Sequence, residues 1–115
     1  MATVTTAEKP TTITKTKPPG NPDLWVKMGE SFEFKLAGNP STGYLWALAR
    51  LPESFFLLNE NYVPDQPMKV GSGGIYHFTF VAMKPKIEGD FLFYMLRPWE
   101  PFAPIEASDW LVKVN

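Results

Sequence analysis

The side chains that could perform catalysis are few in this chain. His77 is the single histidine, and Ser41 or Ser72 would have to serve as the nucleophile of a Ser–His–Asp arrangement. His77 falls in the middle of an expected strand, neither serine lies in a nucleophile-elbow motif, and no acidic residue is placed to orient the imidazole. The scattered carboxylates form no pair suited to glycosidase chemistry; they are Glu88, Asp90, Glu100 and Glu106. The chain is therefore predicted not to be an enzyme, with His77 on a solvated strand face.

A turn-rich motif, Asn39-Pro40-Ser41-Thr42-Gly43-Tyr44, has residue types suited to binding. Its proline fixes φ and its glycine permits a positive φ. The side chains of Asn39, Ser41 and Thr42 can hydrogen-bond to their own backbone. The motif is expected to form a tight, pre-organised loop; the alternative is an ordinary turn.

Two further motifs follow along the chain. Gly71-Ser72-Gly73-Gly74 is not a phosphate-binding loop, because neither a Lys-Ser/Thr pair nor a helix follows it. Its glycines allow a backbone to come close to another group, or simply make a flexible turn. Arg97-Pro98-Trp99-Glu100 combines the arginine and tryptophan that dominate interface energetics with a rigid proline. Trp99 lies past the end of an apolar strand and is expected to be exposed, the alternative being that it folds back onto the domain.

Short strands must position these motifs. Twelve prolines recur too often for long helices. Between them, apolar and polar residues alternate, as in Phe32, Phe34 and Leu36 against Glu33 and Lys35. The predicted fold class is all-β, an immunoglobulin-like antiparallel β-sandwich of about seven strands, with a small closed barrel as the alternative. The expected strands are 23–27, 31–36, 44–50, 55–62, 75–82, 91–96 and 110–114.

The domain organisation follows from the same pattern. Residues 18–115 are expected to form one β-sandwich domain with Trp46 as its core tryptophan. Residues 1–17 are expected to be a leader that is partly disordered or an edge strand, the strand falling at 11–17. The connections 38–43, 63–74 and 97–109 are the least strand-like. In this topology they are predicted to emerge at one end of the sandwich.

Composition excludes several classes of function. The chain has 115 residues and a net charge of −1, which gives no basic stripe for nucleic acid. It has no cysteine and one histidine, so no metal site or cofactor is predicted. No apolar run approaches the ~20 residues of a membrane helix. The chain as given begins with no export signal, so a cytoplasmic location is the default, and a lysosomal or secreted form requires that a signal peptide was removed.

Taken in order and spacing, the three motifs resemble those of the chagasin-type inhibitors of papain-like cysteine peptidases. The resemblance covers about residues 22–115. Ser41 stands where the family more often has threonine, and Tyr44 where an aromatic residue is usual. It implies a non-covalent, reversible inhibitor, monomeric when free, whose three loops form a wedge that occludes the peptidase cleft.

The resemblance also assigns roles within the wedge. Thr42, near the tip of the first loop, would sit against the catalytic cysteine and histidine. The glycine motif would run along the substrate cleft by backbone pairing. Arg97 and Trp99 would pack on the peptidase surface beside the catalytic histidine. The implied peptidase-binding residues are Asn39, Pro40, Ser41, Thr42, Gly43, Tyr44, Gly71, Ser72, Gly73, Gly74, Arg97, Pro98 and Trp99.

Two other functions remain open from the residues alone. One is a carbohydrate-binding β-sandwich module that uses Trp25, Tyr62 and Trp99 as stacking platforms. The other is a structural, adhesion-type domain whose loops are only turns.

Overall fold

A computed structural model describes residues 4–8, 22–66 and 73–115. Gly71 and Ser72 of the glycine motif, and the strand considered at 11–17, lie outside these residues. The described part forms eight strands and one 3₁₀ helix. They are β1 (Val4–Glu8), β2 (Leu24–Val26), β3 (Ser31–Gly38), η1 (Pro40–Thr42), β4 (Leu45–Arg50), β5 (Phe55–Pro64), β6 (Gly74–Ala82), β7 (Glu88–Leu96) and β8 (Glu106–Val114).

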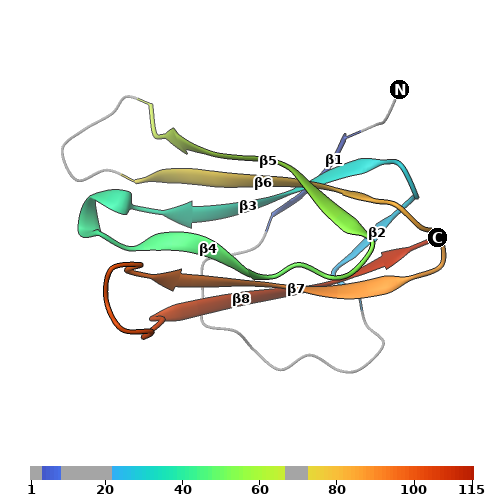
Figure 1. Cartoon of the computed structure of the whole chain (residues 1–115). Helices are drawn as coiled ribbons and strands as arrows, with labels where there is room; N and C mark the ends of the chain where they lie inside the picture. Colours follow the sequence, from blue (N-terminus) through green and yellow to red (C-terminus); the bar gives the residue numbers. More distant parts are fainter. Residues whose placement is uncertain (1–3, 9–21, 67–72) are drawn as a thin grey trace.

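The strands form two four-stranded sheets that face each other (Figure 1). The first has the order β1-β3-β6-β5 and the second β2-β8-β7-β4. This is the A-B-E-D and G-F-C arrangement of immunoglobulin-like sandwiches, with β2 added beside the last strand. No strand of one sheet pairs with the other among the described residues, so the sandwich prediction is confirmed and the barrel is excluded.

Two edge pairings depart from the predicted antiparallel pattern. β1 pairs with β3, and β2 with β8, in parallel, whereas the remaining pairs are antiparallel. Within the leader, β1 is an edge strand of the first sheet. The seven strands predicted from the sequence correspond to β2–β8.

The predicted connections 38–43, 63–74 and 97–109 include residues that the structure assigns to strands. Gly38, Val63 and Gly74 belong to strands, since Gly74 pairs with Gly38 on β3 and with Pro64 on β5. The last strand begins at Glu106, where it pairs with Met95, and not at residue 110. Pairing with an established neighbour extends these strands, because a residue's β-propensity counts for less than its context.

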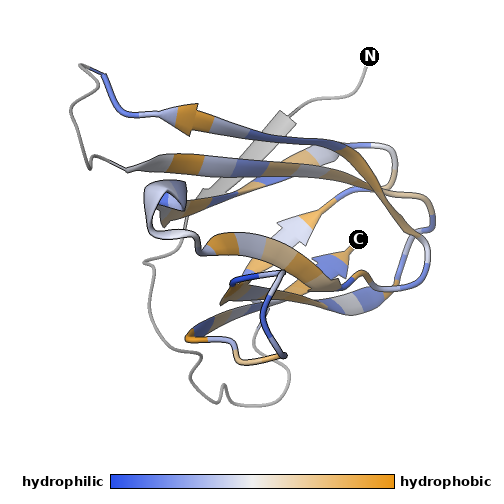
Figure 2. Ribbon diagram, turned by 60° about the vertical axis from the view of Figure 1, so that its left-hand side comes forward, coloured by the Kyte–Doolittle hydropathy of each residue, from blue (hydrophilic) through white to orange (hydrophobic). Residues whose placement is uncertain are grey.

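Aromatic rings fill the space between the sheets. Along the strands, hydrophobic and hydrophilic residues alternate (Figure 2). Trp46 on β4 is 1% exposed, and its indole N–H donates to the Ala37 carbonyl oxygen at 2.9 Å, which confirms it as the core tryptophan. Ring contacts connect both sheets, for example Phe34 with Phe93 at 5.6 Å between centroids. The fully buried phenylalanines are Phe32, Phe34, Phe55, Phe78, Phe80, Phe91 and Phe93.

Candidate functional site

The connections β3–β4, β5–β6 and β7–β8 emerge at the same end of the sandwich (Figure 1). This loop end comprises residues 39–44, 65–73 and 97–105, of which 67–72 are not described. Its first and second connections meet where Gly38 pairs with Gly74. Its first and third meet where Arg97 reaches Thr42. The predicted clustering of the three loops is therefore confirmed.

The first loop is held by its own side chains. The Asn39 carboxamide oxygen accepts from the Ser41 backbone N–H at 3.2 Å and from the Ser41 hydroxyl at 2.6 Å. The Thr42 hydroxyl donates to the Asn39 carbonyl oxygen at 2.8 Å and accepts from the Tyr44 N–H at 3.3 Å. Gly43 ends the 3₁₀ helix with a φ of 90°, a conformation that favours glycine. The loop is thus pre-organised, as predicted, while Pro40, Ser41 and Thr42 are exposed.

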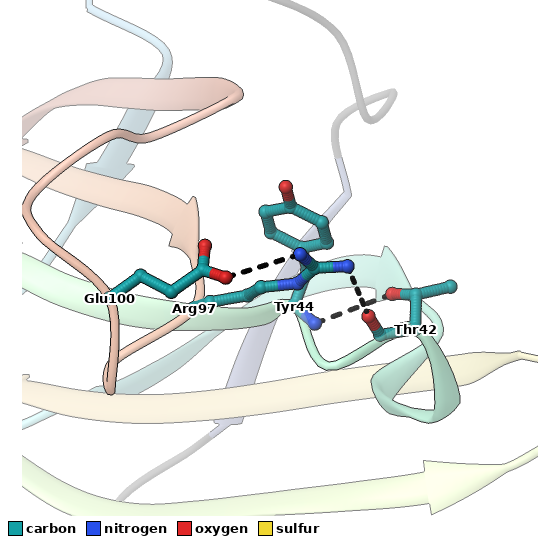
Figure 3. A network of polar contacts seen from close by, with 4 residues as sticks. All are labelled: Thr42, Tyr44, Arg97 and Glu100. Carbon is teal, nitrogen blue, oxygen red and sulfur yellow. Dashed lines mark hydrogen bonds and ion pairs between the residues drawn. The ribbon is translucent and has the colours of Figure 1, made fainter.

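Arg97 ties the third loop to the first (Figure 3). Its Nη2 donates to the Thr42 carbonyl oxygen at 3.1 Å, and its guanidinium lies 4.3 Å from the centroid of the Tyr44 ring. Its Nη1 pairs with the Glu100 carboxylate at 3.3 Å, while its Nε is buried. The arginine therefore engages its own chain on three sides, and the two loops behave as one braced unit.

Trp99 lies against the first loop and still faces solvent. A Cβ added at Gly43 would come within 3.0 Å of the Trp99 ring and 3.2 Å of Arg97 Nε. Gly43 is thus required both by its positive φ and by the close approach of these two side chains. Trp99 nevertheless remains 68% exposed, so the expectation that it is not folded back into the core is confirmed.

The described glycines of the second motif serve the fold itself. A Cβ on Gly73 would lie 2.6 Å from the Gly38 carbonyl oxygen, and one on Gly74 would collide with the Val63 carbonyl oxygen. Asp65 closes the β5–β6 connection by donating its N–H to the Gly73 carbonyl oxygen at 2.9 Å. The close backbone approach that the glycines were expected to permit therefore takes place within this chain.

Two tyrosines whose pairing the sequence did not predict lie beneath the first two loops. The rings of Tyr62 and Tyr76 are 4.9 Å apart, and the Tyr76 ring fills the space beside Gly38. Burial, with a smaller effect from Tyr62, raises the pKa of the Tyr76 phenol. The alternation of β6 was the only signal that places Tyr76 inward. It gives no hint of the contact with Gly38.

His77 lies on the outer face of the first sheet, half-buried. Contrary to the sequence analysis, an acidic residue does stand beside it, because the Glu33 carboxylate is 3.3 Å from His77 Nδ1. Glu33 on β3 pairs with Thr79 on β6. His77 lies two residues before Thr79 and therefore on the same face of the sheet as Glu33. Ser41 lies in the first loop and is hydrogen-bonded to Asn39, so it does not complete a triad with this pair.

The residues described here hold no group of three His, Cys, Asp or Glu side chains able to bind a metal ion. In the same part of the chain, no helix is long and apolar enough to cross a membrane.

The aromatic residues considered for carbohydrate binding do not share a platform. Trp25 is exposed beside Lys113, near the start of β7 and therefore at the end opposite the loops. Tyr62 packs against Tyr76 with its ring tilted, and Trp99 lies against Gly43. These three rings therefore form no row along which a polysaccharide could stack.

Comparison with known proteins identifies relatives across most of the chain. Residues 25–114 match the family model described as Chagasin family peptidase inhibitor I42. Chagasin from Trypanosoma cruzi is 34% identical over 89 residues, covering 73% of this chain and 80% of chagasin. Amoebiasin-1 from Entamoeba histolytica is 35% identical over 99 residues, covering 83% of this chain and 90% of the relative.

Solved structures share the fold. The cysteine protease inhibitor EhICP2 from Entamoeba histolytica superimposes with a TM-score of 0.72 at 17% identity, covering 99% of this chain and 97% of that one. The solution structure of amebosin gives 0.61 at 28% identity, with 100% and 97% covered. PbICP-C, solved in complex with falcipain-2, gives 0.57 at 17% identity, with 99% and 91% covered.

Proposed function

Because this chain belongs to the chagasin family of peptidase inhibitors, we propose that it inhibits papain-like cysteine peptidases reversibly and without a covalent bond. The loop end occludes the substrate cleft of the enzyme. Among the structural relatives, PbICP-C binds a peptidase, falcipain-2. The chain is thus an inhibitor and not itself an enzyme.

The braced pair of loops is the observation that carries this proposal. Residues 39–44 and 97–100 are fixed relative to each other by Arg97, and both Thr42 and Trp99 are left exposed. A surface that is rigid before binding loses little conformational entropy when it docks. A large exposed aromatic ring held in place is the kind of residue that becomes an interface hot spot.

Within the complex, each loop has its own task. Thr42, at the exposed tip of η1, enters the cleft beside the catalytic cysteine and histidine, together with Pro40 and Ser41. Trp99 and Pro98 pack on the peptidase surface next to them. The β5–β6 connection runs along the cleft, where its backbone can pair with groups that bind extended peptides. Gly73 and Gly74 at its end hold this connection against β3 and β5.

The geometry supports a positioning role for Arg97. Its guanidinium is engaged by Thr42, Tyr44 and Glu100 of its own chain. A side chain so occupied contributes to inhibition by fixing the relative position of the two loops. Gly43 and Gly73 likewise contribute by allowing neighbouring segments to approach.

The first loop resists cleavage for a conformational reason. Papain-like clefts bind an extended peptide, whereas residues 40–42 form a 3₁₀ turn closed by the Gly43 N–H donating to the Pro40 carbonyl oxygen at 2.9 Å. A turn does not present an extended scissile bond to the nucleophile. Since the chain has no cysteine, it also has no thiol to exchange with the enzyme.

Titration of active-site-calibrated papain with the protein tests the proposal. We expect residual hydrolysis to fall to zero with a dissociation constant in the nanomolar range or below, about −12 kcal/mol. Full activity should return on dilution, and trypsin should be unaffected at the same concentrations. Papain that stays fully active with micromolar protein present would refute the proposed function.

A further inference from the structure

The third loop carries an apolar surface that the three motifs do not include. We name it the apolar ledge, and it comprises Tyr94, Pro101, Phe102, Ala103 and Ile105. Phe102 is 71% exposed, the highest value among the exposed large hydrophobic residues described, and Ile105 is 48% exposed. Isolated exposed hydrophobic residues are common, but a contiguous apolar group beside a binding loop marks an interaction surface.

Phe102 is held in place although it faces solvent. Its ring packs edge-on against Tyr94, with centroids 5.3 Å apart and planes at 73°. Tyr94 points to the outer face of the second sheet, because its neighbours Phe93 and Met95 point into the core. The Ile105 N–H donates to the Met95 carbonyl oxygen at 2.9 Å, which closes the loop just after the ledge.

Prolines stiffen the same segment. Pro98, Pro101 and Pro104 fix φ at three of the seven positions from 98 to 104. The one charged residue in that stretch, Glu100, is paired with Arg97. Docking of an apolar partner therefore requires neither the ordering of a flexible loop nor the desolvation of an unpaired charge.

The ledge continues the surface that carries Trp99. Trp99 and Phe102 are three residues apart on one loop; Trp99 lies against Gly43 on the first loop, and Phe102 against Tyr94 on the sheet. The exposed apolar surface thus extends from the loop end onto the outer face of the second sheet. Because Phe102 lies on the same loop as Trp99, a peptidase that receives Trp99 comes close to the apolar ledge.

We propose that the apolar ledge is a second contact with the same peptidase, in which Phe102 packs on an apolar patch outside the substrate cleft. This inference rests on the proposed function. Phe102 adds binding energy that does not depend on the cleft itself, as hot-spot aromatic residues do when they become buried.

Substitution of Phe102, with a matched control at the opposite end, tests the inference against papain and falcipain-2. Phe56 on β5 is also exposed, at 56%, but it lies at the start of its strand, away from the loops. Phe102→Ala is expected to raise the dissociation constant at least tenfold for either enzyme, mainly through the off-rate. Phe56→Ala should leave both constants unchanged, and the melting temperatures of both variants should stay near that of the original protein.

A dissociation constant for Phe102→Ala within twofold of the unsubstituted protein, with both enzymes, overturns the inference. Phe102→Asp is a second test in case truncation to alanine changes the dissociation constant only slightly. It would place a carboxylate against the apolar patch and should weaken binding more than Phe102→Ala does. If the unsubstituted protein inhibits, and Phe102→Ala and Phe102→Asp inhibit as well as it does, only the second contact is refuted. If the unsubstituted protein does not inhibit either enzyme, the proposed function itself fails.

Discussion

Aromatic side chains build both the interior of this sandwich and its loop end, but they are held in different ways. Between the sheets, rings hold rings: Phe34 contacts Phe93 at 5.6 Å and Trp110 at 4.7 Å between centroids, and all three are buried. At the loop end, Trp99 and Phe102 are held by a glycine and a single tyrosine and stay exposed.

The difference separates stability from recognition. An aromatic ring buried between the sheets has already released its hydration water and contributes to folding. An exposed ring that is fixed in one place still carries its hydration water. It releases that water, and gains the free energy of burial, only when a partner covers it. Truncation of an interior ring should therefore reduce stability, and truncation of a loop-end ring should reduce binding.

Trp46→Ala is the substitution expected to have the largest effect. It removes a fully buried ring together with its hydrogen bond to the Ala37 carbonyl oxygen, which should cost roughly 3–5 kcal/mol of unfolding free energy. Chemical denaturation followed by far-UV circular dichroism measures the loss. A loss below about 1 kcal/mol would show that the core does not depend on this ring and would break the comparison.

Arg97→Met is expected to have an intermediate effect, on both properties. It keeps the apolar stem but removes the donor to the Thr42 carbonyl oxygen and the cation over the Tyr44 ring. The expected cost is about 1–2 kcal/mol of stability, with a roughly five- to tenfold weaker inhibition of papain, because the two loops are no longer fixed together. Thermal melting and inhibition constants provide the two measurements.

Glu100→Gln is the matched control for Arg97→Met. It removes only the ion pair between half-exposed side chains, which should change stability by less than about 1 kcal/mol. If Arg97→Met behaves like this control in both assays, Arg97 does not brace the loops.

His77→Ala is expected to have the smallest effect. The imidazole pairs with Glu33 on the outer face of the first sheet, a contact worth at most about 1 kcal/mol near a surface, and it lies outside the loop end. Papain inhibition by this variant should equal that of the original protein. A folded variant that has lost inhibition would reveal a role for His77 that the geometry does not supply.

Much of the fold could be predicted because its signal is local. The alternation of Phe32 and Phe34 with Glu33 gives both the strand and its buried face. Trp46 was assigned to the core from its place on the third expected strand of an immunoglobulin-like sandwich, because its own strand does not alternate. The start of β8 was missed because Glu106-Ala107-Ser108 has no such pattern. Its pairing is provided by β7.

The three loops were predicted to cluster at one end of the sandwich, but the contacts that join them were not. Arg97 and Thr42 are 55 residues apart in sequence, and no local pattern reports that their loops meet. Gly73 lies 35 positions after Gly38, and only the pairing of β3 with β6 shows what a side chain at either glycine would meet. A Cβ on Gly73 would meet the Gly38 carbonyl oxygen, and a Cβ on Gly38 would meet the Tyr76 ring. Phe102 was overlooked because a proline-rich loop gives no periodic signal of exposure.

Trp99→Ala, assayed for both melting temperature and papain inhibition, tests the central claim most directly. Because Trp99 is exposed in the free protein and becomes buried in the complex, we expect a melting temperature within about 2 °C of the original. The dissociation constant should rise about 30-fold or more, equivalent to at least ~2 kcal/mol. A melting temperature lowered by several degrees with unchanged inhibition would contradict the account, since it would make Trp99 a structural residue and leave the wedge without its third loop.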